Sequence, residues 1–133
     1  MLHQTTQNPV MQNCIEECKQ CHDMCLQMAM TYCLEQGGKH VEQDHIRLMI
    51  NCAEICQTAA NFMLSDSPLS SSVCNACADV CYACAESCEE IDDMEECARA
   101  CRLCAESCEQ MAEIELSRER SSRPNTVSPY ANA

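Results

Sequence analysis

Residues 77–88 decide the fold of this chain: they read CADVCYACAESC, and cysteine recurs in steps of 4, 3 and 4 residues. Residues 97–108, CARACRLCAESC, repeat the same spacing, and so do the cysteines between positions 14 and 25. Residues three and four apart lie on one face of an α-helix. The repeated pattern therefore predicts helices that each carry a stripe of thiols along one face.

Four such stripes run along the chain, and every cysteine except Cys33 belongs to one of them. The stripes are Met11, Cys14, Cys18, Cys21, Cys25 and Met28; His45, Met49, Cys52, Cys56, Ala59 and Met63; Cys74, Cys77, Cys81, Cys84, Cys88 and Ile91; and Met94, Cys97, Cys101, Cys104, Cys108 and Met111. These positions are where a helical bundle normally places leucine and isoleucine. The pattern predicts an all-α protein, an antiparallel four-helix bundle whose core is lined with cysteine.

Three breaks divide the chain into helices at roughly 9–36, 41–65, 70–91 and 93–116. They are the only two glycines, Gly37 and Gly38, the segment around Pro68, and the acidic stretch around Asp92 and Asp93. Glycine pairs end helices, and short connections favour antiparallel neighbours. We expect residues 1–8 to be a flexible N-terminus and residues 117–133, which are polar and contain two prolines, to be a disordered tail.

The composition narrows the function. The chain has 16 Cys and 9 Met, one Phe, no Trp, and a formal net charge of −13. Such an acidic chain is a poor partner for nucleic acid, whose phosphates would repel it. Its N-terminus has no basic and apolar leader, and no stretch is long and apolar enough to span a membrane. These features favour the cytosol, where thiols stay reduced.

Three interpretations of the buried thiols remain open. Protonated cysteine packs as a small hydrophobe, but leucine would pack better and would not oxidise. Disulfides within a helix would be strained, because neighbouring Cβ atoms lie about 5–6 Å apart, whereas disulfides between helices are feasible. A general soft-metal buffer, including zinc, is the third interpretation. No nucleophile–base pair and no phosphate-binding loop is present, so we do not expect an enzyme.

Cu(I) suits the stripes best among soft metals. Thiolate and thioether ligands select Cu(I). One Cu(I) per thiolate leaves the core neutral, whereas four thiolates around Zn²⁺ leave a charge of about −2, which is costly to bury. We therefore expect multiple Cu(I) ions on the cysteines: Cys14, Cys18, Cys21, Cys25, Cys33, Cys52, Cys56, Cys74, Cys77, Cys81, Cys84, Cys88, Cys97, Cys101, Cys104 and Cys108.

One end of the predicted bundle carries side chains that bind copper more weakly than thiolate does. His40, His45, Met49 and Met28 gather there beside Cys33 and are candidate entry-port ligands. At the other end, Met11, Met63 and Met111 are candidates for a plug. His3 and His22 lie off the stripes, and we expect them to be solvated.

The repeated C-x3-C-x2-C-x3-C pattern in a short acidic chain resembles the bacterial copper storage proteins over residues 9–116. The resemblance implies Cu(I) storage inside a four-helix bundle that forms a homotetramer. As partners we expect copper ions and small-molecule or protein copper donors and acceptors, but no membrane. In lacking a twin-arginine signal, the chain resembles the cytosolic branch of that family. By position, the implied sites are Cys14/Cys18, Cys21/Cys25, Cys52/Cys56, Cys77/Cys81, Cys84/Cys88, Cys97/Cys101 and Cys104/Cys108.

Overall fold

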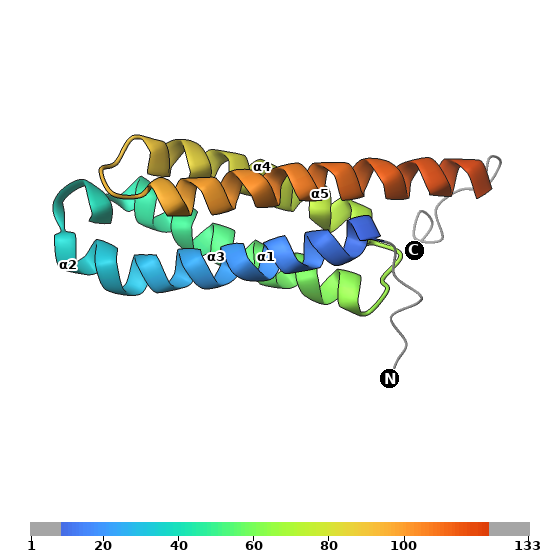
Figure 1. Cartoon of the computed structure of the whole chain (residues 1–133), viewed down its shortest axis with the longest axis horizontal. Helices are drawn as coiled ribbons and strands as arrows, with labels where there is room; N and C mark the ends of the chain where they lie inside the picture. The colour runs from blue at the N-terminus through green and yellow to red at the C-terminus, as the bar shows by residue number, and fades with distance from the viewer. Residues whose placement is uncertain (1–8, 123–133) are drawn as a thin grey trace.

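The computed structural model describes residues 9–122, which form a bundle of four long helical segments (Figure 1). Its elements are α1 (Pro9–Met28), η2 (Ala29–Cys33), α2 (Leu34–Gln36), η3 (Gly38–Val41), α3 (Gln43–Leu64), α4 (Ser70–Glu89) and α5 (Glu95–Ser122). Successive long segments run in opposite directions and are joined by short turns. The prediction of an all-α four-helix bundle is confirmed.

Helices α1 and α3 pack side by side, as do α3 and α4, α4 and α5, and α1 and α5. The centre of this ring is filled by small side chains. All sixteen cysteines are fully buried. The remaining core is mostly alanine and methionine, and Ile15, 2% exposed, is the one branched aliphatic side chain in the core of the described residues. Thiols thus occupy the space that larger hydrophobes fill in most bundles.

The connections follow the breaks in the sequence. Gly37 and Gly38 have φ values of 67° and 56°, a conformation that glycine adopts without steric cost. Asp66 and Asp93 also have positive φ, at 56° and 66°, which aspartate tolerates better than most residues. Because the backbone of Asp93 is in the left-handed conformation, α5 begins at Glu95, later than the predicted start at 93.

The predicted helix ranges need further correction, and α4 ends at Glu89 rather than at the predicted position 91. The segment from 9 to 36 is not one regular helix, because residues 29–33 form a π-helix. The residues before Gln43 form a short 3-10 helix, so α3 starts later than the predicted position 41. Helix α5 continues to Ser122, so the predicted disordered tail is wrong for residues 117–122, while 1–8 and 123–133 lie outside the described residues.

Candidate metal centre

The four stripes converge on the axis of the bundle, and thiols from different helices lie next to one another. Cys18 of α1 lies 3.5 Å from Cys108 of α5, and Cys56 of α3 lies 3.5 Å from Cys81 of α4, measured between sulfurs. Even the diagonally opposed α3 and α5 meet, with Cys56 and Cys104 sulfurs 3.7 Å apart. Each helix presents its cysteines inward because the 3-4 spacing keeps them on one face.

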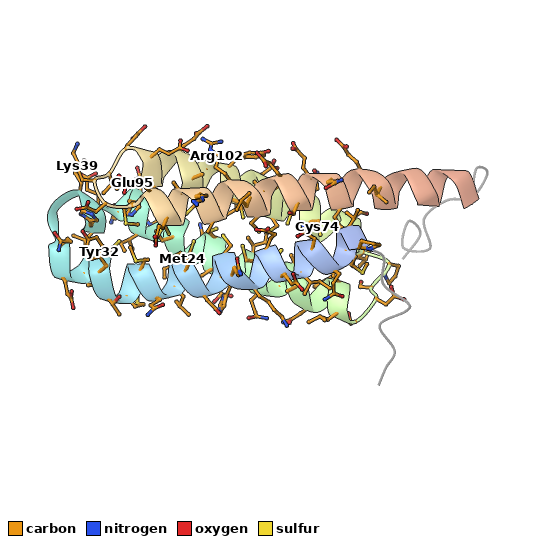
Figure 2. All side chains as sticks on the ribbon, viewed as in Figure 1. Met24, Tyr32, Lys39, Cys74, Glu95 and Arg102 are labelled. Atoms are coloured by element: carbon orange, nitrogen blue, oxygen red, sulfur yellow. The ribbon has the colours of Figure 1, made fainter. Side chains whose placement is uncertain are left out.

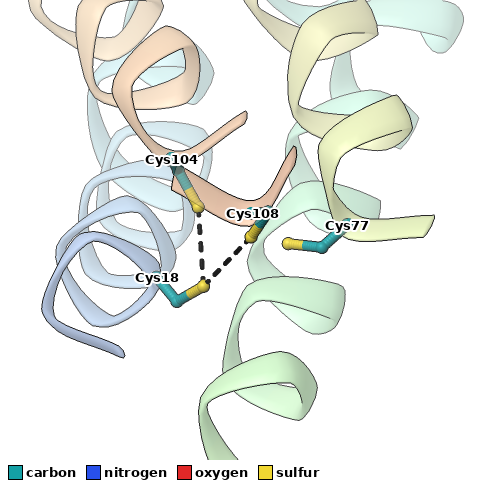
Figure 3. Close-up of side chains that lie close together, drawn as sticks. All are labelled: Cys18, Cys77, Cys104 and Cys108. Atoms are coloured by element: carbon teal, nitrogen blue, oxygen red, sulfur yellow. Dashed lines mark hydrogen bonds between the residues drawn. The ribbon is translucent and has the colours of Figure 1, made fainter. Parts of the chain in front are cut away.

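Four groups of thiols are close enough to share metal ions, since the sulfurs within each group lie within 4.8 Å of one another. The groups are Cys14, Cys74 and Cys108; Cys18, Cys77, Cys104 and Cys108; Cys21, Cys56, Cys81 and Cys104; and Cys21, Cys25, Cys52 and Cys101. Figure 3 shows the second group, in which the Cys18 sulfur faces those of Cys104 and Cys108 at 3.6 and 3.5 Å.

These groups are connected rather than separate. Cys108 belongs to the first and second groups, Cys104 to the second and third, and Cys21 to the third and fourth. They therefore form a continuous series of sulfurs along the bundle axis, which we call the thiol column. A thiolate that belongs to two groups can bridge two metal ions, so shared sulfurs would let several ions fit into a small volume.

Neighbours within one helix are no closer than neighbours across helices. The i and i+4 sulfurs are 3.9 Å apart for Cys21 and Cys25, 4.0 Å for Cys52 and Cys56, and 3.8 Å in α4 for Cys77 and its partner Cys81. A two-coordinate ion with metal–sulfur bonds of about 2.3 Å would span about 4.6 Å, so small side-chain rotations suffice. These three implied pairs can therefore each hold an ion, and their sulfurs also lie close enough to other helices for cross-helix bridging.

The cysteines are all free thiols. Even the closest pairs, Cys18 with Cys108 and Cys56 with Cys81, have sulfurs 3.5 Å apart, far longer than the 2.03–2.05 Å of a disulfide bond. The bundle is therefore closed by packing and helix connections without covalent crosslinks.

Sulfur–sulfur hydrogen bonds shift the pKa values of individual thiols in opposite directions. Hydrogen bonds from Cys104 and Cys108 lower the pKa of Cys18 to about 6. The pKa of Cys84 is likewise lowered to about 6, chiefly by hydrogen bonds with Cys101 and Cys25. A lowered pKa favours the thiolate, which is the form that binds a soft cation.

Other thiols stay protonated. At Cys74, a hydrogen bond with Cys108 lowers the pKa, but the contact with Cys14 and the burial of the thiol raise it to about 12. Burial also raises the pKa of Cys33. Metal binding at these positions must release a proton, so it is favoured as pH rises.

Cys33 reaches the core through the π-helix η2. Cys33 follows Cys25 by eight residues, which in a regular α-helix would turn it about 80° away from the stripe. The extra residue that a π-helical turn accommodates restores the register. Cys33 is fully buried, with its sulfur 3.9 Å from His45 Nε2 and 4.0 Å from Met94 Sδ. The spacing of the cysteines in the sequence does not predict this π-helical turn.

His45 is held at the start of α3 between the core and the surface. Its Nδ1 atom lies 2.8 Å from the Ser87 hydroxyl, and only 3% of the residue is exposed. Burial lowers its pKa, which keeps the imidazole neutral and available as a ligand. A surface cavity of about 260 Å³ reaches His45 and is lined by Lys39, Glu42, Asp44, His45, Ser87, Glu90 and Ile91.

The other candidate port residues take different places. His40 Nε2 lies 3.0 Å from the Asp92 carbonyl oxygen, and its ring stands edge-on to Tyr32 at 5.5 Å. Tyr32 and Lys39 lie at the end of the bundle opposite Cys74 (Figure 2). Met28 is half-buried at the edge of the core, because Ala29 takes the core position above Cys25.

Met49 lies deeper than a port residue. It is fully buried, and its sulfur is 3.6 Å from Cys88, 3.7 Å from Cys84 and 4.0 Å from Cys97. The stripe predicts an inward-facing Met49, but only the packing of three helices reveals the convergence of sulfurs on it.

The expectation that His22 is solvated is wrong. Its Nδ1 atom lies 2.7 Å from the Ala53 carbonyl oxygen, so the ring bridges α1 and α3 at the edge of the core. His3 lies outside the described residues. At the end opposite His45, Met63 and Met111 are fully buried and Met11 is 6% exposed, which is the arrangement expected of a plug.

Within residues 9–122, no helix combines the length and the apolar character that crossing a bilayer requires.

A protein-family model described as copper storage protein matches residues 7–113. This chain belongs to the copper storage protein family. A curated relative, the uncharacterized cysteine-rich protein YhjQ of Bacillus subtilis (strain 168), is 42% identical over 79 residues, which cover 59% of this chain and 72% of the relative.

Solved structures show the same bundle. The Nmul_A1745 protein from Nitrosospira multiformis is 58% identical with a TM-score of 0.80, and the match covers 81% of this chain and 99% of that one. Cu(I)-bound copper storage protein BsCsp3 is 40% identical with a TM-score of 0.71, over 77% of this chain and 98% of that one. A cytosolic copper storage protein from Streptomyces lividans, solved with five coppers, is 30% identical with a TM-score of 0.58, over 81% and 92% of the two chains.

Proposed function

We propose that this member of the copper storage protein family stores multiple Cu(I) ions on the thiolates inside its bundle. The observation that carries the proposal is the thiol column, in which groups of three and four sulfurs share members along the axis. Each of the chain's sixteen cysteines is a proposed ligand, and thiolates that belong to two groups of the column can bridge ions. Cu(I)-bound structures of related proteins support the assignment of the metal.

The shared sulfurs favour Cu(I) over zinc. A structural zinc site is a closed set of four ligands. Groups that share Cys21, Cys104 and Cys108 cannot each supply a separate set of four thiolates to a Zn²⁺ ion. Cu(I) accepts fewer sulfurs per ion, and one cation per thiolate neutralises a core in which uncompensated charge is costly.

We propose that copper enters the bundle at the end that holds His45. His45 lines the 260 Å³ cavity, and the buried Cys33 sulfur lies 3.9 Å from its Nε2 atom and 4.0 Å from the Met94 sulfur. His40 and Met28 lie on the outer side of this end, whereas Met11, Met63 and Met111 close the other end. Imidazole and thioether bind Cu(I) more weakly than thiolate does, so ions move inward along increasing affinity.

The setting of this store is also a proposal. We expect a bacterial, cytosolic protein, in line with the Streptomyces lividans relative, which is a cytosolic copper storage protein. We expect a homotetramer, small-molecule or protein copper donors and acceptors, and no catalytic activity. The high density of acidic side chains on the surface argues against a nucleic-acid partner.

An anaerobic Cu(I) titration of the reduced protein tests storage directly. The protein competes with a Cu(I) chelator of known affinity, and free thiols are counted in parallel. We expect uptake that approaches one Cu(I) per cysteine. Uptake of only a few ions would point to a discrete site, tighter uptake of Zn²⁺ would point to a general soft-metal buffer, and few titratable thiols before reduction would point to a disulfide protein.

A further inference from the structure

Four cysteines lie outside the thiol column, and three of them surround a methionine. Cys84 and Cys88 come from the last two turns of α4, and Cys97 comes from the first turn of α5. All three sulfurs lie within 4.0 Å of Met49 Sδ, which comes from α3. Three helices therefore bring four sulfur atoms together at one point that is sealed from solvent.

The position of Met49 in its helix explains this arrangement. Met49 precedes Cys52 by three residues on the inward face of α3, at a position that carries a thiol in the other stripes. Helix α3 supplies only Cys52 and Cys56 to the column. At the level of Cys84 and Cys88, the sulfur that α3 contributes is a thioether.

A comparison with Met63 separates this contact from ordinary packing. Met63 lies in the same helix and is equally buried. Among the residues that the structure describes, no thiol donates a hydrogen bond to the Met63 sulfur, whereas Cys84, Cys88 and Cys97 all donate to the Met49 sulfur. Hydrophobic filling accounts for Met63, but it gives no reason for three thiols to point at one thioether.

We propose that Met49, Cys84, Cys88 and Cys97 form a mixed thiolate–thioether Cu(I) site. Thioether sulfur is a soft ligand that, like thiolate, selects Cu(I). It carries no charge and no proton, so it coordinates without adding to the negative charge that the core must neutralise. The inference rests on the proposed storage function and assigns a further donor to it.

The site also connects the entry port to the column. Met49 lies one helical turn below His45 on the same face of α3. On the inner side, the Cys97 sulfur is 3.9 Å from that of Cys25, which belongs to the column. An ion held by Met49 and Cys97 is thus adjacent to the all-thiol groups. Because one of its ligands is a neutral thioether, this site should bind Cu(I) less tightly than the all-thiol groups do.

Methyl NMR of protein labelled with ¹³C at the methionine methyl groups tests the site. Cu(I) has a filled d shell, so bound ions do not broaden the resonances. Met49→Leu identifies the Met49 signal, and Met63→Leu is the matched control from the same helix. Exchanging methionine for leucine conserves volume and is tolerated in cores. Sequential assignment of the wild-type protein identifies both signals if either variant fails to fold.

We expect the Met49 methyl signal of the wild type to shift on Cu(I) loading while the Met63 signal stays in place. We also expect Met49→Leu to retain about one Cu(I) fewer than Met63→Leu against the same chelator. A protein that takes up many ions with an unmoved Met49 signal would overturn the mixed site and leave storage intact. A wild type that fails to take up multiple ions would instead overturn the storage function.

Discussion

The Nε2 atom of His45 lies 3.9 Å from the Sγ atom of Cys33, across the interface between α3 and the π-helix η2. This contact exists because the π-helix returns Cys33 to the core face, and because Ser87 fixes the His45 ring at 2.8 Å. Together they place a nitrogen ligand on the wall of the surface cavity and a sulfur ligand buried behind it. The first step of copper uptake should therefore depend on them more than the total capacity does.

Replacing His45 with glutamine should slow Cu(I) transfer from a chelator several-fold, with little change in the number of ions held. The substitution removes the imidazole ligand but leaves the thiol column in place. Stopped-flow absorbance of the chelator measures the transfer rate. His22→Gln is the control, because His22 also contacts a neighbouring helix but lies away from the cavity. Equal transfer rates in the two variants would contradict a port at His45.

Replacing Tyr32 with phenylalanine should speed the removal of bound Cu(I) by an excess of chelator. The Tyr32 hydroxyl donates to the Asp93 carboxylate at 3.1 Å and ties the η2 segment to the connection between α4 and α5. The lost hydrogen bond is exposed, so we expect the free energy of unfolding to fall by no more than about 1 kcal/mol. Chelator competition followed over time measures release. Tyr82→Phe is the control, because its hydroxyl contacts Glu109 on the outer surface. Equal release from both variants would argue that η2 does not limit exit.

Replacing Cys104 with alanine should reduce capacity by more than one Cu(I). The Cys104 sulfur lies 3.6 Å from that of Cys18 in one group and 3.7 Å from that of Cys56 in the next, so it can serve more than one ion. Loss of the buried sulfur should lower the free energy of unfolding of the metal-free protein by about 1 kcal/mol. Copper analysis after desalting and denaturant unfolding measure the two effects.

Cys33→Ala provides the comparison for this loss. Cys33 contacts a histidine and a methionine rather than other thiols, so its removal should cost about one ion at most. Equal losses from the two variants would show that thiols bind ions independently rather than through shared groups.

The stability of the metal-free protein should fall above pH 9 in a way that depends on Cys74. The folded pKa of this thiol is about 12, above its ordinary value of 9.0. A raised folded pKa means that the stabilisation is complete below pH 9 and is lost as pH rises toward 12, since the unfolded thiol ionises first. This loss amounts to about 1.4 kcal/mol per pH unit.

Denaturant unfolding at pH 8 and pH 10 under reducing conditions measures the effect. The decrease in unfolding free energy should be smaller for Cys74→Ala than for the wild type. A decrease of the same size in both proteins would assign the pH dependence to other thiols.

Reduced protein without metal should be helical. All sixteen cysteines are buried, and a protonated thiol packs as a small hydrophobe, so the core can form without metal. Far-ultraviolet circular dichroism before and after anaerobic Cu(I) loading should give nearly the same helical spectrum, with a higher melting temperature after loading. A random-coil spectrum in the reduced, metal-free state would show that copper folds the chain.

Several features are predictable from local spacing. The 4-3-4 steps of Cys14, Cys18, Cys21 and Cys25 predict an inward stripe because helical periodicity depends only on positions in sequence. Gly37 and Gly38 likewise predict the first turn. Cys33 is a candidate ligand only because it is a cysteine. In a regular helix, its spacing from Cys25 would turn it away from the core.

The sequence by itself determined that this chain forms four helices with thiols on their inner faces, because periodicity and turn residues are local properties. Only the tertiary structure decided which thiols meet. The closest cysteines, such as Cys18 and Cys108, are brought together by helix packing across long separations in sequence. The π-helical turn that brings in Cys33 and the three thiols around Met49 also depend on how neighbouring helices fit, and side-chain spacing along one helix carries no information about that fit.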